Sequence, residues 1–171
     1  MKLLAITFGS ILIGGLQVAH AEQIDKSMQD QAFVNEAARG GTMEVELGQL
    51  AERNASTPTI KEFGSRMVKD HTRLNDELGS VAASIGLQVP KDLLPEQQSE
   101  YARLSKLSGK SFDKEYIDLM VKDHTDDLAA FKKAESATEN NKLKKAIAEA
   151  IPVIQEHLSM AKSDSAKVAI R

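Results

Sequence analysis

Residues 61–72, with the sequence KEFGSRMVKDHT, recur 53 positions later as residues 114–125, KEYIDLMVKDHT. Eight of the twelve positions are identical, and the second copy has Tyr116 where the first has Phe63. Unrelated amphipathic helices share apolar spacing, but they rarely share a run such as Met-Val-Lys-Asp-His-Thr in one register. The repeat therefore predicts two helices of common origin, one in each half of the chain.

Apolar residues continue outward from both copies at helical steps of three, four and seven. This period predicts amphipathic helices that bury one face. The sequence predicts four long helices, over residues 29–54, 58–85, 112–138 and 142–166.

The connections between these helices are of two kinds. Residues 54–58 and 139–141 are short, so each predicts an antiparallel hairpin. Residues 87–110 form a long crossover between the hairpins, with a short helix at about 95–107. The sequence therefore predicts an all-α fold, a ferritin-like antiparallel four-helix bundle with a long crossover that carries a short helix between helices two and three.

Local signals mark the helix ends. Ser56 or Thr57 can cap the second helix, Gly86 ends it, and Ser111 is expected to cap the third. Pro152 lies inside the fourth helix, where proline removes a backbone hydrogen bond. We expect a kinked fourth helix there, with two shorter helices as the alternative.

The composition excludes several classes of protein. With 171 residues, of which 4% are aromatic and none is Trp, the chain suits one helical domain, or two small ones, better than a strand-rich fold. A net charge of −3 lacks the basic excess of nucleic-acid-binding proteins, so no nucleic-acid partner is expected. The absence of Cys from the sequence excludes disulfides, thiolate zinc sites and cysteine nucleophiles.

Residues 1–21 have the three-part pattern of a secretory signal peptide. Lys2 supplies a positive charge, residues 3–18 are largely apolar, and Ala19-His20-Ala21 is a small-x-small cleavage site. A membrane anchor is the alternative, but the run is at the short end for a bilayer core of about 30 Å. We expect cleavage after Ala21.

The remaining residues, 22–171, are expected to form a single domain with its core at about 28–166. No later segment is apolar enough to span a bilayer, so no integral membrane segment is expected after cleavage. A chain without Cys that is exported from a bacterium fits the periplasm, where free thiols are oxidised.

Each long helix places one polar residue on or near its apolar stripe. These residues are Glu44, His71, His124 and His157. Three imidazoles and a carboxylate can satisfy one another around a divalent transition-metal ion such as Zn, Cu, Fe or Ni. A metal-free polar network between the helices explains the same pattern, and both interpretations stay open at this stage.

Four further carboxylates are candidates for supporting roles near these residues. Asp70 and Asp123 lie within the repeat, next to the histidines, but they point about 100° away from those histidines on an ideal helix, so they suit outer contacts rather than ligation. Asp127 lies one turn after His124 and can reach the same neighbourhood. Glu36 of the first helix completes this group.

The chain resembles a family of exported bacterial proteins, domain of unknown function 4142, which is grouped with ferritin-like proteins. The resemblance covers residues 30–161. It rests on FVNEAA at 33–38, EVELGQLA at 44–51, the two copies of Met-Val-Lys-Asp-His, Phe112-Asp-x-x-Tyr116, and Pro152 followed by His157-Leu-x-x-Ala161. The resemblance implies a four-helix bundle in the cell envelope, with no established reaction, ligand or protein partner.

The sequence favours a binding protein over an enzyme. Ferritin-like di-iron sites need two Glu-x-x-His motifs, but Val68, Val121 and Ile154 stand where those glutamates would be. A phosphate-binding loop and a nucleophile elbow are also missing, so we predict no catalytic residue. Two hypotheses follow: a periplasmic bundle that binds a transition metal in metal handling or stress tolerance, or a metal-free envelope stress or interaction protein.

Overall fold

The computed structural model describes residues 13–169, with side chains from residue 22 onward. The described residues form five helices and no strand, which confirms the all-α prediction. The helices are α1 (Ile13–Asn54), α2 (Pro58–Ser84), α3 (Pro95–Leu104), α4 (Gly109–Ala137) and α5 (Asn141–Ala169).

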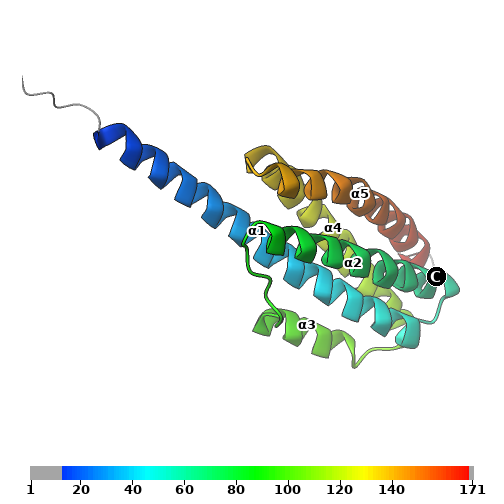
Figure 1. The fold of residues 1–171 in the computed structure, drawn as a ribbon. Helices are drawn as coiled ribbons and strands as arrows, with labels where there is room; N and C mark the ends of the chain where they lie inside the picture. The colour runs from blue at the N-terminus through cyan, green and yellow to red at the C-terminus, as the bar shows by residue number, and fades with distance from the viewer. Residues whose placement is uncertain (1–12, 170–171) are drawn as a thin grey trace, which may run out of the picture.

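The four long helices pack side by side, and α3 lies in the connection between α2 and α4 (Figure 1). Helix α1 contacts α2 and α4, and α5 contacts the same two helices from the other side. The short connections reverse the chain direction between α1 and α2 and between α4 and α5 (Figure 1). As a result, one stripe of each long helix faces a shared interior.

Helix α1 begins earlier than the sequence pattern suggested, at Ile13 rather than at residue 29. Its N-terminal part extends beyond the other helices (Figure 1). Of the expected signal peptide, residues 1–12 lie outside the described residues, and the backbone of residues 13–21 continues α1. None of the helices in the described part of the chain combines the length and the apolar content that a membrane crossing requires.

The helix ends follow the expected turn chemistry with one correction. The Thr57 side chain accepts a hydrogen bond from the Ile60 amide, and Gly86 has a φ of 78° just after α2. The N-cap position of α4 is Ser108 rather than Ser111, because the helix begins at Gly109, and the Ser108 side chain makes no capping hydrogen bond. Helix α5 runs continuously through Pro152, so the alternative of two shorter helices was wrong.

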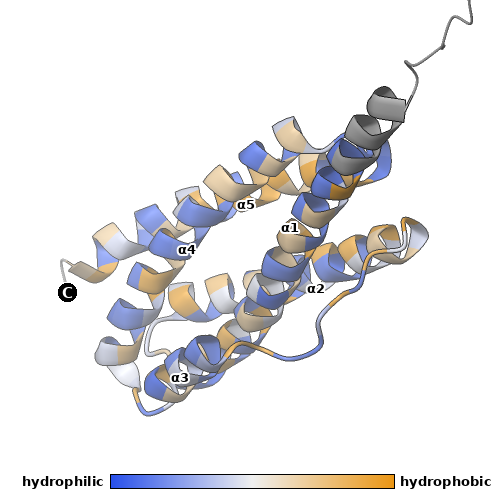
Figure 2. Ribbon diagram, turned by 90° about the vertical axis from the view of Figure 1, so that its left-hand side faces the viewer, coloured by the Kyte–Doolittle hydropathy of each residue, from blue (hydrophilic) through white to orange (hydrophobic). Residues whose placement is uncertain are grey.

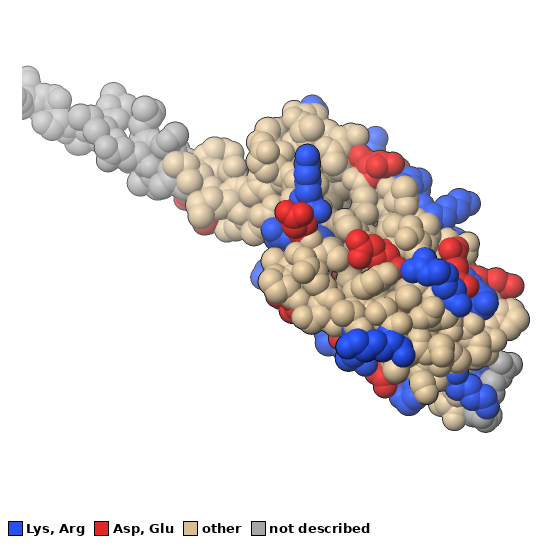
Figure 3. Space-filling view, turned by 90° about the horizontal axis from the view of Figure 1, so that it is seen from below, with Lys and Arg blue, Asp and Glu red and all other residues tan. Residues whose placement is uncertain are grey.

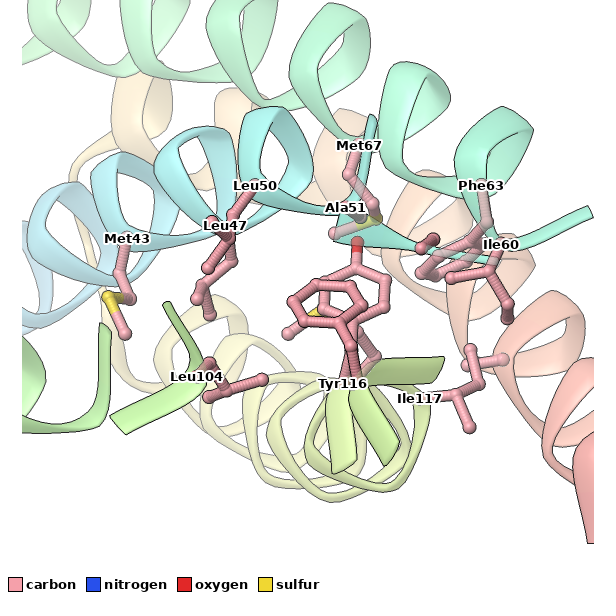
Figure 4. Packing of buried hydrophobic residues seen from close by; sticks show 14 residues of the cluster. Met43, Leu47, Leu50, Ala51, Ile60, Phe63, Met67, Leu104, Tyr116 and Ile117 are labelled. Atoms are coloured by element: carbon pink, nitrogen blue, oxygen red, sulfur yellow. The ribbon is translucent and has the colours of Figure 1, made fainter. Parts of the chain in front are cut away.

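Two clusters of buried apolar residues fill the interior. Figure 2 shows hydrophilic and hydrophobic residues alternating along each long helix, as amphipathic packing requires. The larger cluster includes Leu47, Phe63, Met67 and Tyr116, and the smaller one includes Val34 and Leu143. In Figure 4 the Tyr116 ring points from α4 into the larger cluster. On the face seen in Figure 3, acidic and basic side chains are interspersed.

Helices α1 and α2 approach each other closely at a pair of glycines. A Cβ on Gly48 would lie 2.7 Å from the Gly64 carbonyl oxygen, and a Cβ on Gly64 would lie 2.7 Å from the Ala51 Cβ. No larger residue fits at either position without moving a backbone. This contact fixes how the two helices are set against each other close to Glu44 and His71.

Candidate metal centre

Four buried polar side chains meet in the interior, one from each long helix. Glu44 comes from α1, His71 from α2, His124 from α4 and His157 from α5. Their exposed fractions are 4%, 4%, 0% and 0%. The three imidazole ring centres lie 5.1 to 5.7 Å apart. The structure therefore brings together all four residues that the sequence singled out.

One ring nitrogen from each histidine lies close to one from each of the other two. The three candidate ligand nitrogens lie within 4.8 Å of one another. Some point is then within about 2.8 Å of all three, against a Zn–N bond of about 2.0–2.1 Å. Side-chain adjustments of less than about 1 Å would bring the nitrogens to bonding distance.

Four buried atoms of these side chains have no hydrogen-bond partner. They are Nε2 of His71, Nε2 of His124, Nδ1 of His157 and Oε1 of Glu44. Glu44 Oε1 lies 3.4 Å from His124 Nε2, but the pair does not form a hydrogen bond. Buried polar atoms normally find partners, so four such atoms in one place need an explanation.

The second nitrogen of each ring is held by an acceptor. His71 Nδ1 donates to Glu44 Oε2 at 2.9 Å, His124 Nδ1 donates to the Met120 carbonyl at 3.0 Å, and His157 Nε2 donates to Asp70 Oδ2 at 3.0 Å. Because each of these nitrogens carries the proton, the other nitrogen of each ring presents a lone pair to the shared point. Metal-binding histidines are oriented in the same way in known sites.

Burial and neighbouring charges set the protonation of the four groups. Burial lowers the pKa of His157 to about 4, and burial also lowers the pKa of His124. Burial alone would raise the pKa of Glu44, but attraction to His71 and His124 outweighs it and lowers that pKa to about 2. Near neutral pH the site therefore holds an anionic Glu44 carboxylate beside neutral His124 and His157 imidazoles.

Asp70 is the outer carboxylate that touches the histidines directly. It hydrogen-bonds to His157, which lies across the interior on α5, rather than serving its neighbour His71. Arg66 in turn contacts Asp70 and places a second nitrogen 3.2 Å from Glu156. Asp70, which lies on α2, thus supports the candidate ligand His157 on α5.

The other three outer carboxylates lie on a surface cleft. Glu36, Asp123 and Asp127 line a cleft of about 280 Å³ that also reaches Glu44. Burial and the charge of Glu44 raise the pKa of Asp123 to about 6 and that of Asp127 to about 9. These three residues contact none of the histidines through a hydrogen bond among the described residues.

Sequence reasoning missed two participants in the site. The Met120 carbonyl fixes the His124 ring, and the i to i+4 spacing of these two residues was the available signal. Arg66 anchors Asp70, and the same spacing between Arg66 and Asp70 pointed to it. Sequence spacing also gave no sign that the Tyr116 hydroxyl would be buried without a partner.

The family model for the domain of unknown function DUF4142 matches residues 15–163. The chain belongs to this family. No protein of curated function matches the DUF4142 chain at a significant level. The family match confirms the resemblance seen in the sequence.

Solved structures share the fold of this DUF4142 protein at low sequence identity. A structure described as CopM in the Cu(II)-bound form is 18% identical with a TM-score of 0.66, covering 81% of this chain and 97% of its own. A DUF305 fragment from Deinococcus radiodurans is 12% identical with a TM-score of 0.72, covering 81% and 96%. The conserved hypothetical protein rv2844 from Mycobacterium tuberculosis is 13% identical with a TM-score of 0.63, covering 82% and 93%. At these identities the likeness shows the fold.

Proposed function

We propose that this DUF4142 protein binds one divalent transition-metal ion through His71, His124, His157 and Glu44. The observation that carries the proposal is the approach of three buried histidine nitrogens within 4.8 Å of one another, with the unpartnered Glu44 Oε1 beside His124. A cation satisfies the three imidazole nitrogens at once, because each offers a lone pair, and Glu44 Oε1, 3.4 Å from His124 Nε2, is close enough to join them.

A metal-free polar network explains the arrangement less well. Such a network stabilises a protein when every buried member is paired. Here each ring donates its proton outward, to Glu44, the Met120 carbonyl or Asp70, so no N–H is left to bridge the rings. The outward hydrogen bonds hold the rings, and the inward lone pairs are available for a ligand.

The ligand chemistry favours a borderline metal ion. Imidazole nitrogens suit Cu, Zn and Ni, and a single carboxylate suits one ion better than a pair of irons. The proteins that share the fold include CopM in Cu(II)-bound, Ag-bound and Cu(I)-bound forms. Copper is therefore the first metal to test, with Zn²⁺ and Ni²⁺ as the comparison ions.

The proposal extends to the architecture and the compartment. The four long helices make a ferritin-like antiparallel bundle, in which α3 belongs to the long crossover between the two hairpins. Residues 1–21 act as a cleavable signal peptide, and residues 22–171 form a single periplasmic domain without a nucleic-acid partner. There the protein contributes to metal handling or stress tolerance by holding one ion, without catalysing a reaction.

Elemental analysis and titration test the proposal. Protein purified from its own host without a histidine tag is expected to contain close to one equivalent of Cu, Zn or Ni. After removal of the metal, titration with Cu²⁺ is expected to saturate at one ion per chain. The double variant His71→Ala/His124→Ala is expected to lose this site. A native protein without metal, together with no saturable binding in titration, would leave the metal-free envelope protein as the better description.

A further inference from the structure

The surface cleft beside the metal centre is lined by acidic side chains. Its walls carry Glu36 from α1, Glu96 and Glu100 from α3, and Asp123, Asp126 and Asp127 from α4. Lys and Arg are absent from the described residues that line it. Three separate helices therefore direct carboxylates into one cleft of about 280 Å³.

Neighbouring basic residues neutralise only part of this charge. Lys122 Nζ lies 2.8 Å from Asp126 and 4.0 Å from Asp123. Arg103 pairs with Glu100 at 2.7 Å. The other three wall residues, Glu36, Glu96 and Asp127, form no ion pair within the part of the chain that the structure describes, and because the pKa of Asp127 is about 9, the charges left unpaired near neutral pH are those of Glu36 and Glu96. The cleft therefore keeps a net negative potential that attracts cations.

The cleft leads to an unpartnered ligand atom of the metal centre. Glu44 is 4% exposed and its Oε1 has no hydrogen-bond partner, yet the residue lines the cleft. It also lines an inner cavity of about 40 Å³ that includes His71, a space larger than one water molecule needs. Gly40 and Asp127 likewise line both spaces. A Cβ on Gly40 would meet no atom within 4 Å, so the junction has open space beside this residue.

We propose that a divalent transition-metal cation enters through this acidic cleft, passes Gly40, and reaches the histidines by way of Glu44. This inference rests on the metal site proposed above. The wall carboxylates concentrate cations at the mouth, as charged clefts do for their ligands. Glu44 is the carboxylate that faces both the cleft and the imidazoles, so it receives the ion and shares it with the three nitrogens.

The first experiment measures how fast Cu²⁺ binds to the metal-free protein. The chain has 2 Tyr and no Trp, so stopped-flow tyrosine fluorescence reports quenching by Cu²⁺ without Trp background. The test variant is Glu36→Gln/Glu96→Gln. The matched control is Asp76→Asn/Glu149→Gln, which removes the same charge from a surface hollow between α2 and α5.

The cleft variant is expected to bind Cu²⁺ about three- to tenfold more slowly than the control variant at 10 mM salt. The difference is expected to disappear at 0.5 M salt, where charges act over only a few Å. Both variants are expected to keep one Cu²⁺ site per chain. Equal association rates in the two variants at low salt would overturn the route and leave the metal site intact.

A second experiment narrows the junction without changing charge. The variant Gly40→Leu fills the open space on α1, and Leu is a better helix former than Gly, so the protein is expected to fold. Gly79→Leu on α2 is the control, because a Cβ there also meets nothing within 4 Å while Gly79 lines neither the cleft nor the inner cavity. Gly40→Leu is expected to slow Cu²⁺ association and dissociation by the same factor, at least threefold, and to leave the affinity unchanged.

The two proposals fail in different ways. Unchanged association and dissociation rates in Gly40→Leu would show that the ion does not pass this junction. If wild-type protein shows no Cu²⁺ binding that depends on His124, the metal site itself is wrong, and the route is rejected with it. Slower binding in both cleft variants, with both controls like wild type, supports the route.

Discussion

Replacement of His124 by Ala separates a metal ligand from a structural histidine. The side chain is fully buried, and its Nδ1 donates to Met120 within its own helix. Its loss therefore leaves the hydrogen bond between Glu44 and His71 in place. The cost without metal is the lost volume and packing, about 2–4 kcal/mol, as for other large-to-small core substitutions.

The response to metal is the decisive quantity. Free metal at 100 times its dissociation constant stabilises the folded wild type by about 2.7 kcal/mol, which raises Tm by about 5–10 °C in a chain of this size. If the lost ligand weakens binding by about 100-fold, the same metal concentration stabilises His124→Ala by only about 0.4 kcal/mol. We expect differential scanning calorimetry, with and without Cu²⁺ or Zn²⁺, to show a shift of less than about 2 °C in the variant.

Asp113→Ala provides a control with an intact metal site. The Asp113 carboxylate accepts three hydrogen bonds from Ser56 and Thr57, so its loss also destabilises the protein. It lies eleven positions before His124, or about 16 Å along α4. We expect this variant to keep the full Tm increase with metal. An equal increase in Tm with metal in His124→Ala and in wild type, or no increase in either, would refute the reasoning. His124→Asn, which loses less volume, replaces His124→Ala in this experiment if the Ala variant does not fold.

Three further predictions follow from the same geometry. Asp70→Asn weakens the acceptor that fixes the tautomer of His157, so metal affinity by isothermal titration is expected to fall about 10–100-fold with little loss of Tm in metal-free protein. The pKa of Asp127 is raised to about 9, so the folded chain holds a proton that the unfolded chain releases above about pH 4. The free energy of unfolding therefore falls as the pH rises between these two values. In urea unfolding, Asp127→Asn is expected to raise the free energy of unfolding by about 1 kcal/mol or more at pH 8 and to change it very little at pH 4. Gly48→Ala is expected to cost about 1–3 kcal/mol because its Cβ meets the α2 backbone, whereas Gly79→Ala, in open space, is expected to gain about 0.5–1 kcal/mol in the same assay.

Helix content and the inward direction of the ligand candidates were accessible from the sequence. Apolar steps of three and four fix which face of a helix is buried, so His71 and His124 could be placed on inward stripes from their neighbours alone. The turn signals at Thr57 and Gly86 also have a local physical cause, and the structure confirms both. The Ser111 cap was wrong because α4 begins two residues earlier, at Gly109, with Ser108 in the cap position.

The depth at which the histidines meet was not accessible in this way. It depends on how far each helix slides along its neighbour, and that is decided by contacts such as Gly48 with Gly64. The partner of Asp70 depends on the same register, because it lies on α5, 87 positions away in the chain. Sequence spacing describes one helix at a time. It can suggest that two helices are in contact, but it cannot tell which residues of the two helices meet.

The glycine contact between α1 and α2 also bears on selectivity. Because the two backbones are in contact there, neither helix can slide along the other or move away from it without breaking that contact. Glu44 lies only one helical turn from Gly48. The distance between the Glu44 carboxylate and the imidazoles is then fixed by the helix packing before a metal ion binds. A metal site with fixed distances between its ligands selects ions by their radius and preferred bond length. A substitution at Gly48 that loosens the helix contact would therefore reduce the selectivity of the site between ions, even if its affinity for them stayed the same.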